Sequence, residues 1–488
     1  MARRWSAILY YSGLILAGLG ALSQSKELMA GGTLAVALGY GLTDYFSARP
    51  DSITPMTINA LVFGVWIGLG HLVACFVVNT RYEATFYSYA AMDFLLEAQY
   101  LATLTVIVPL VTYRWFTTLQ GGSRRFLPRV PAVALEVSDR TLLICCLALL
   151  AFDSAGKLFT FSFEFLGTLA GFLSKSSEIA IFLLTWHWLG PSPTLPKWTR
   201  GLLGLWIIFD VVYAAAFSYM RGEMAAPLFA FFLAFLLRKI VTKRVAVIAS
   251  LVIVVFGGVY KIIGETRGSG IFGSERFEII REEFLSYGSD GNRTPKDQRD
   301  DFPLMPLIAR GCHFGQLSQV VRIADAEGYY YGATLEYLSY AFIPRIIWPE
   351  KPLITPGQWF AEKIGRGSQI SETQFSNSID MSVAGELYLN FGWAGAIVGL
   401  TLMAVLYGVF WESAGFYGTG NNPTGQVLAI AILLQATGGS SAGAIVQLVF
   451  FYLGALTISL VFMSFLKRTK TTRTPGPRRM AGSGIADG

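Results

Sequence analysis

Apolar runs long enough to cross a lipid bilayer recur along most of this chain. A transmembrane helix needs roughly 20 consecutive apolar residues, and the 488 residues are 53% hydrophobic and only 14% charged. Ordinary soluble domains carry about 25% charged residues. The sequence therefore predicts an all-α polytopic membrane protein, and we expect no nucleic-acid partner.

About twelve transmembrane helices are expected. The first apolar run follows Arg3 and Arg4, as a secretion signal would, but a second run follows almost at once and the residues between them make a poor cleavage site. We therefore interpret the first run as a retained helix. The expected spans lie near residues 6–23, 28–46, 56–78, 92–113, 140–153, 172–189, 201–219, 223–237, 245–263, 384–411, 425–437 and 444–466.

The basic residues of the short loops predict the orientation of these helices. Lys and Arg are enriched in cytoplasmic loops, and four basic groups, in residues 3–4, 114–129, 238–244 and 467–479, fall on the same side of the expected helices. The short loops on the other side carry balanced charge. We expect both termini in the cytoplasm, although an additional crossing within residues 154–171 would invert every later helix.

One long loop divides the chain. We expect a bundle of about nine helices in residues 1–263, a loop on the exported side in residues 264–383, three helices in residues 384–466 and a basic tail in residues 467–488. A loop far longer than about 15 residues is usually functional or a small domain. Within it, residues 274–287 and 313–326 show the helical spacing of apolar side chains.

Four arginines lie at the exported end of a span or in the long loop. A guanidinium group binds phosphate through two parallel hydrogen bonds and keeps its charge under ordinary conditions. Each one has an alternative role, either pairing with a nearby acid or reaching lipid headgroups. For the set we favour an anion cradle, and the set comprises Arg221, Arg267, Arg310 and Arg345.

Glu386 is the candidate general base. It falls in the first turn of a span that begins near Ser382 or Val383, where the helix dipole stabilises a carboxylate by about 0.3–1 kcal/mol. This stabilisation is the purely structural alternative to a catalytic role for Glu386. Asn390 lies one turn later on the same face, and a polar stripe in a span normally faces a cavity. A carboxylate there can accept a proton from a sugar hydroxyl.

Other loop residues have two interpretations each. His313 is the alternative base because an imidazole titrates near neutrality, but a surface or helix-capping role is more common for histidine. Lys351 either pairs with Glu350 or Glu362, or contributes an ammonium group to a phosphate site. The expected acceptor side of the cavity comprises Asn390, Tyr388 and Trp348.

Several motif matches do not indicate chemistry. Residues 439–443 fit G-x-S-x-G, but they lie between two apolar helices and not at the strand-to-helix turn that a nucleophile elbow needs. Gly64 with Gly68, and Gly395 with Gly399, fit G-x-x-x-G, which indicates close helix packing. The long loop holds no D-x-D pair and no histidine cluster with ligand spacing, so we expect neither a metal nor a cofactor.

The segments that carry these residues resemble a known family. FIPRIIWPEKP, followed about thirty residues later by SVAGELYLNFGWAGAIVG and preceded by SYMRGEM, is similar to the Wzy-type O-antigen and oligosaccharide repeat-unit polymerases. The resemblance covers residues 219–399. It implies a bacterial inner-membrane glycosyltransferase that polymerises undecaprenyl-diphosphate-linked repeat units into O-antigen, capsule or exopolysaccharide on the periplasmic face.

The resemblance also implies a metal-independent, inverting transfer in which arginines hold the diphosphate. Here that role would fall to the four arginines and Lys351, and Glu386 or His313 would activate the acceptor hydroxyl. Expected partners are the lipid-linked donor and acceptor, membrane lipids, and a chain-length regulator or export machinery. Two alternatives stay open: a glycan ligase that uses the same donor, and a transporter or flippase of lipid-linked oligosaccharides.

Overall fold

The computed structural model describes most of the chain. The described residues are 2–119, 127–128, 130, 139–159, 176–190, 195–217, 221–266, 275, 278–279, 281–282, 304–341, 343, 347–348, 350–352, 356–367, 369–371, 374–375, 378–415, 423–436 and 443–471. Nearly all of them are helical. Turns connect the helices, and the strands among the described residues are one short antiparallel pair, β1 (Gln369–Ser371) and β2 (Gln374–Phe375), in the long loop.

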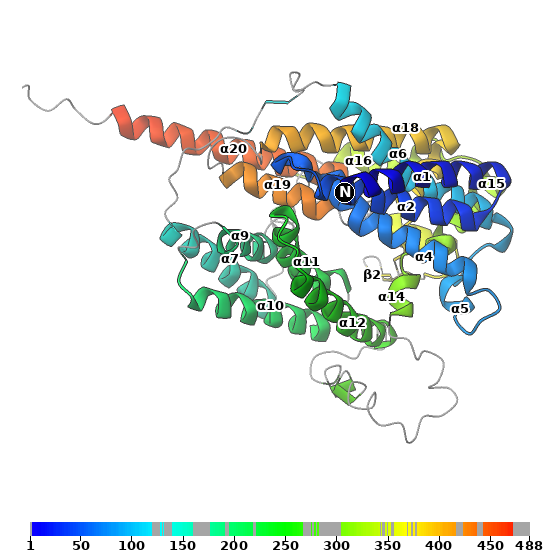
Figure 1. Cartoon of the computed structure of the whole chain (residues 1–488), viewed down its shortest axis with the longest axis horizontal. Coiled ribbons are helices and arrows are strands. Elements are labelled where there is room, and N and C mark those ends of the chain that lie inside the picture. Colours follow the sequence, from blue (N-terminus) through cyan, green and yellow to red (C-terminus); the bar gives the residue numbers. More distant parts are fainter. Residues whose placement is uncertain are drawn as a thin grey trace, which may run out of the picture.

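One group of helices builds the larger part of the core (Figure 1). α2 packs along α1 and α4, and α6 packs against α18, so the helices before and after the long loop share one hydrophobic core. The helices of this group are α1 (Ala2–Ser23), α2 (Lys26–Tyr45), α3 (Pro55–Asn59) continued by a π-helical turn (Ala60–Gly64) and α4 (Val65–Phe76), α6 (Leu95–Leu119), α18 (Val383–Ala414), α19 (Pro423–Ala436) and α20 (Gly443–Thr471).

A second group of helices lies beside the first (Figure 1). α9 packs against both α7 and α11, and α10 packs against α11. Contacts between α9 and α19 join the two groups, and their buried side chains belong to the same core. The helices of this group are α7 (Asp139–Phe159), α9 (Ser176–Trp188), α10 (Trp198–Phe217), α11 (Arg221–Leu237) and α12 (Lys243–Thr266).

The structure confirms the helical class of the prediction. Each expected span coincides with a helical segment. Within the described part of the chain, five helices are long and apolar enough to cross a membrane, and the others are shorter or less apolar. The total of twelve spans therefore stays a prediction. The five helices are Ala2–Ser23, Pro55–Phe76, Met92–Thr118, Trp198–Ala216 and Val383–Ala414.

Glycine allows the close packing of α2 on α4. A Cβ added at Gly68 would lie 2.7 Å from the Cα of Leu34, and one added at Gly64 would lie 3.0 Å from the Cβ of Ala37. Only a residue without a side chain lets the two backbones approach this closely. The predicted packing role of Gly64 and Gly68 is confirmed.

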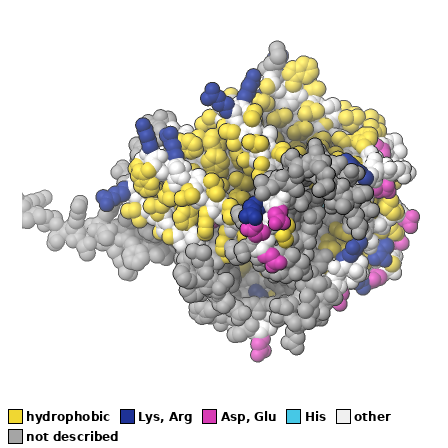
Figure 2. All heavy atoms as spheres, turned by 90° about the horizontal axis from the view of Figure 1, so that it is seen from below, with side chains coloured by type: hydrophobic (Ala, Val, Ile, Leu, Met, Phe, Trp, Pro, Cys, Tyr) yellow, Lys and Arg dark blue, Asp and Glu magenta, His cyan; other side chains and the backbone are white. Residues whose placement is uncertain are grey.

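Basic residues from distant segments meet at one end of the molecule. The Nζ of Lys239, in the turn after α11, donates to the backbone oxygens of Ser47 and Arg49 at 2.6 and 2.8 Å. The guanidinium of Arg114, near the end of α6, lies 5.1 Å from the ring centroid of Tyr10. On the face in Figure 2, Lys and Arg side chains at one edge stand apart from the acidic ones. The side and the cytoplasmic location assigned to the basic residues stay predictions.

α18 does not run straight through the bundle. Gly392 adopts φ 67° and ψ −158°, which interrupts the helix. Beyond the break the chain folds back, because a Cβ at Gly399 would lie 2.4 Å from Leu387 and one at Gly395 would lie 3.0 Å from the backbone oxygen of Leu387. Along a straight helix, residues 387 and 399 would stand about 18 Å apart. The expected span at 384–411 is thus a helical hairpin, and its Gly395 and Gly399 pack the two arms as predicted.

The second arm of the hairpin is long enough to cross a bilayer alone. Residues 393–414 are helical and would extend about 33 Å, which matches a hydrocarbon core of about 30 Å. The first arm, residues 383–391, packs on α15 (Phe314–Glu327), since Gly385 lies against Leu317 and Val320. The start of α18 is therefore buried inside the bundle and is not at a free surface.

The described part of the long loop is also packed into the bundle. It forms α14 (Met305–Ala309), α15, a 3₁₀ turn (Ala333–Leu335), α16 (Tyr337–Ala341) and α17 (Pro356–Lys363). A Cβ added at Gly311 would lie 2.3 Å from the backbone oxygen of Trp66, and a Cβ added at Gly70 would lie 2.4 Å from the carbonyl carbon of Gly311. Gly70 lies six residues before the end of α4 at Phe76, which is about 9 Å along the helix. Because the loop contacts α4 at this depth, it enters the bundle between the helices.

Candidate functional site

Of the four predicted arginines, the structure describes the side chain of Arg310. Arg221 is the first residue of α11, but nothing is described of its side chain. Arg267 and Arg345 lie outside the described residues. The predicted convergence of all four therefore stays a prediction, and the site is built here around Arg310.

A chain of buried polar groups holds the start of α15. The backbone N–H of His313 donates to Nε2 of His71 at 3.0 Å. Because Nε2 is an acceptor, the neutral imidazole carries its proton on Nδ1 and donates it to Oε1 of Gln99 at 2.9 Å. The amide of Gln99 in turn donates to Thr103 at 3.2 Å. Side chains from α4 and α6 thus anchor the inserted loop through satisfied hydrogen bonds.

The imidazole of His313 is held in its neutral form. His313 occupies the position before the first residue of α15, but its side chain makes no capping hydrogen bond. Its ring lies 6.1 Å from Phe63 and 6.4 Å from His71, centroid to centroid. Burial, together with the fields of His71 and Arg310, lowers its pKa to about 3. A base of such low pKa is poorly matched to catalysis near neutrality.

Arg310 is exposed and acts on several neighbours. Burial raises the pKa of Asp380, while the N–H of Ser382 and the charge of Arg310 oppose that rise. Burial also raises the pKa of Tyr89, and the charge of Arg310 opposes that rise. Arg310 thus stands where the loop, the turn before α18 and the segment before α6 meet.

A second arginine, absent from the predicted set, lies beside the same tyrosine. The Cζ of Arg366, just after α17, lies 5.6 Å from the ring centroid of Tyr89, and its charge also lowers the pKa of that phenol. The sequence signal for Arg366 is weak: it is a lone arginine between Gly365 and Gly367. Two exposed guanidinium groups, Arg310 and Arg366, therefore act on Tyr89 from distant parts of the loop.

Glu386 lies in the first turn of α18, as predicted. Ser382 caps the helix, since its hydroxyl accepts from the N–H of Gly385 at 3.3 Å. Ser382 itself has φ 61°, a left-handed conformation that is uncommon for serine, and its N–H donates to Asp380 at 3.2 Å. Glu386 is only 2% exposed. The side chain of Glu386 is thus buried in the first turn of a helix whose N-cap residue, Ser382, donates to Asp380.

Asn390 is on the same face as Glu386 but serves the packing of the loop. Its amide nitrogen donates to the backbone oxygen of Glu386 at 2.7 Å and to the hydroxyl of Thr334 at 2.6 Å, and its oxygen accepts from the N–H of Gly332 at 2.9 Å. Asn390 has no exposed surface. The loop at 332–334 thus takes up the amide of Asn390, and the expected cavity-lining role of this residue stays a prediction.

The remaining predicted residues are dispersed. Tyr388 is buried against Trp393, with ring centroids 4.9 Å apart, whereas Trp348 is 38% exposed and packs edge-to-face on Tyr340. Lys351 is 8% exposed, and its Nζ donates to the backbone oxygens of Ala341 and Ile343 at 3.2 and 2.9 Å. Lys351 thus closes the turn after α16, and the phosphate contact expected of it stays a prediction.

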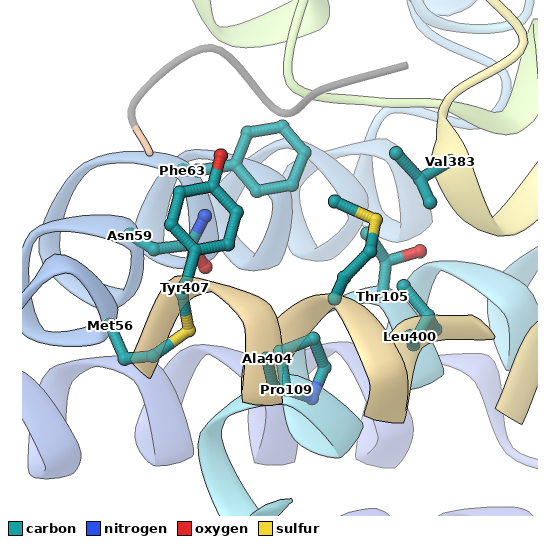
Figure 3. Close-up of a pocket in the computed structure, with 10 residues that line it drawn as sticks. Met56, Asn59, Phe63, Thr105, Pro109, Val383, Leu400, Ala404 and Tyr407 are labelled. Atoms are coloured by element: carbon teal, nitrogen blue, oxygen red, sulfur yellow. The ribbon is translucent and has the colours of Figure 1, made fainter. Parts of the chain in front are cut away.

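A small pocket lies next to the start of α18. Figure 3 shows Val383, from the first arm of the hairpin, and Leu400 and Ala404, from the second arm, around one space with Phe63 and Asn59. The pocket holds about 40 Å³, enough for a few water molecules and too little for a sugar. Within the described residues, no three His, Cys, Asp or Glu side chains are placed to hold a metal ion.

The low pKa of His313 predicts acid sensitivity of the inserted loop. The unfolded imidazole, with a pKa near 6.5, takes up a proton before the folded one does, whose pKa is about 3. The contribution of His313 to stability is therefore complete above pH 6.5 and is lost as the pH falls toward 3. We expect hydrogen exchange of the α15 amides to accelerate below pH 6 in the wild type.

His313→Gln is the matched variant, because it cannot take up the proton yet keeps the backbone N–H that donates to His71. The difference between the two proteins in α15 exchange, after correction for intrinsic rates, isolates the imidazole. Equal acid sensitivity of both proteins would contradict the assignment.

No protein-family model, no curated protein and no solved structure matches this chain.

Proposed function

We propose that this chain is a membrane glycosyltransferase that joins polyprenyl-diphosphate-linked oligosaccharide repeat units. The observation that carries the proposal is the placement of ionisable groups. The charge of Arg310 acts on both His313 and Asp380, which belong to two different segments, and Glu386 follows Asp380 by six residues, in the first turn of α18. Ionisable groups inside a membrane protein are costly and usually functional. The sequence resemblance to repeat-unit polymerases agrees with this placement.

In the proposed reaction, the hydroxyl oxygen of the incoming repeat unit attacks the anomeric carbon of the growing glycan. The bond from that carbon to the diphosphate oxygen breaks, and polyprenyl diphosphate leaves with the bonding electrons. Glu386 accepts the hydroxyl proton. A single displacement inverts the anomeric configuration.

Arg310 and Arg366 would bind the leaving diphosphate. Both side chains are exposed on the loop side of the bundle, and preorganised cations stabilise the charge that develops there, by about 3–4 kcal/mol per donor. The proposed base is buried. The acceptor therefore has to reach it between α15 and the first arm of α18, and the loop has to open for each turnover.

The test uses purified protein, a polyprenyl-diphosphate repeat unit and no added metal. We expect a ladder of longer products, and Arg310→Ala should slow the lengthening about 10²- to 10³-fold. Arg322→Ala is the control. Arg322 is exposed like Arg310, but it lies on α15, where its Nε donates to Gln319 at 2.7 Å. That variant should retain the wild-type rate.

Two other outcomes identify the alternatives. A single unit added to a foreign acceptor would indicate a glycan ligase, whose donor chemistry is the same. Absence of turnover with movement of the lipid across the bilayer would indicate a flippase. An unchanged ladder in Arg310→Ala would remove Arg310 from the proposed site.

A further inference from the structure

A separate cavity of about 640 Å³ lies between α1 and α6. This size is within the range of about 300–1,000 Å³ found for ligand pockets. On α6 the lining residues recur every three or four positions, so they share one face and extend over about 15 Å from Glu97 to Ile107. We call this cavity the α1–α6 groove. It is lined by Leu14, Ala17, Gly18, Ala21, Met29, Glu97, Tyr100, Thr103, Leu104, Ile107 and Trp393.

The groove opens toward the outer face of α1. A Cβ added at Gly18 would have no atom of the described residues within 4 Å. Neighbouring apolar side chains of α1 are exposed, namely Ile15 at 63%, Leu19 at 51% and Leu22 at 86%. α1 is one of the helices long and apolar enough to cross a membrane. In a bilayer this opening would therefore face lipid.

The groove is polar at one end and apolar along the rest. Its polar end lies where α1 meets α2, since the hydroxyl of Tyr100 donates to the backbone oxygen of Ala21 at 2.7 Å. Glu97 lies at the same end, one turn before Tyr100. Its Oε2 is buried and has no hydrogen-bond partner among the described residues. A shielded carboxylate oxygen that has no donor among the described residues can accept a hydrogen bond from a ligand.

We propose that the α1–α6 groove binds one acyl chain of a phospholipid whose headgroup carries a primary ammonium, such as phosphatidylethanolamine. The chain would lie along Leu104 and Ile107, and the ammonium would donate to Glu97. A choline headgroup has no N–H to donate, and an anionic headgroup would be repelled by the carboxylate. The ligand is thus defined by its ammonium, and the proposal is independent of the glycosyltransferase function.

Trp393 provides the readout because it lines the groove. The protein is reconstituted in vesicles that contain phosphatidylethanolamine or phosphatidylcholine with identical brominated acyl chains, and quenching of tryptophan fluorescence is titrated. Subtracting the Trp393→Phe signal isolates the contribution of Trp393. We expect this contribution to be half-quenched at an about tenfold lower fraction of the ethanolamine lipid, the factor of one charge-assisted hydrogen bond.

Two variants test the groove and its polar end separately. Gly18→Leu should fill the groove without displacing the backbone and remove the Trp393-specific quenching. Gly201→Leu is its control, because Gly201 is also helical, on α10, and in the part of the chain that the structure describes it also has nothing within 4 Å of an added Cβ. Glu97→Gln should retain quenching and reduce the headgroup preference to about twofold or less.

Three results would overturn the proposal. The first is equal quenching by the two lipids in the wild type. The second is stronger quenching by a brominated phosphatidylglycerol than by the ethanolamine lipid. The third is wild-type quenching in Gly18→Leu when that variant has the same thermal unfolding midpoint as Gly201→Leu.

Discussion

Replacing Glu386 with glutamine should abolish glycan lengthening and leave the protein folded. Glutamine has nearly the same shape and keeps the packing of the buried first turn of α18, where Glu386 is 2% exposed. It cannot accept the proton of the acceptor hydroxyl. Loss of a general base typically slows a reaction about 10²- to 10⁴-fold, and we expect the rate of ladder formation to fall within that range.

The measurement is the rate per folded molecule. Thermal unfolding of Glu386→Gln should stay within a few degrees of the wild type, because the capping bond from Ser382 to Gly385 is unchanged. Glu336→Gln is the control, since Glu336 is an exposed carboxylate on the same loop. A variant that retains wild-type lengthening would leave Glu386 with only its helix-dipole role.

Replacing Gly392 with alanine should have the largest effect on the structure. The backbone of Gly392, with φ 67° and ψ −158°, is in a region that is essentially restricted to glycine, and a side chain there costs roughly 1–3 kcal/mol. The added Cβ would also lie 2.9 Å from the phenol ring of Tyr329. We expect a lower unfolding temperature and an opened hairpin.

The docking of the loop on the hairpin reports this change. The N–H groups of Tyr330 and Tyr331 donate to the oxygens of Leu389 and Asn390, both at 3.0 Å, and these oxygens are available because the helix breaks at Gly392. Hydrogen exchange of the two amides should accelerate in Gly392→Ala. If Gly392→Ala exchanged these amides at the wild-type rate, the break would not be what positions the loop.

Two further variants serve as controls for Gly392→Ala. Gly454 lies in the middle of α20, and no described atom is within 4 Å of a Cβ added there. Gly454→Ala should therefore be neutral or stabilising by up to about 1 kcal/mol. Combining Gly392→Ala with Tyr329→Ala removes the overlap and retains the backbone strain. The double variant therefore separates the two causes.

Much of the helical architecture could be predicted because it depends on local patterns. The apolar runs predicted the helices, the spacing in residues 313–326 predicted α15, which runs Phe314–Glu327, and the start of α18 after Ser382 was also correct. Close packing at Gly64, Gly68, Gly395 and Gly399 followed from the same reasoning. Each of these predictions used a sequence pattern that spans only a few helical turns.

The candidate site could be predicted only in part. Glu386, Arg310 and His313 were selected by residue type, but contacts between distant segments decided their environments. Arg366 was missed because only folding brings it beside Tyr89. Lys351 and Asn390 were assigned to ligands because their hydrogen-bond partners, at Ala341, Ile343, Gly332 and Thr334, could not be identified before the loop was placed.

The amino-acid sequence alone determined that this chain is a helical membrane protein, because burial of apolar runs and backbone hydrogen bonding within helices are local requirements. Tertiary structure decided that the long loop enters the bundle and that α18 turns back at Gly392. Those features depend on partners hundreds of residues away, such as His71 for His313 and Trp66 for Gly311. No local pattern records which of many compatible polar groups will meet.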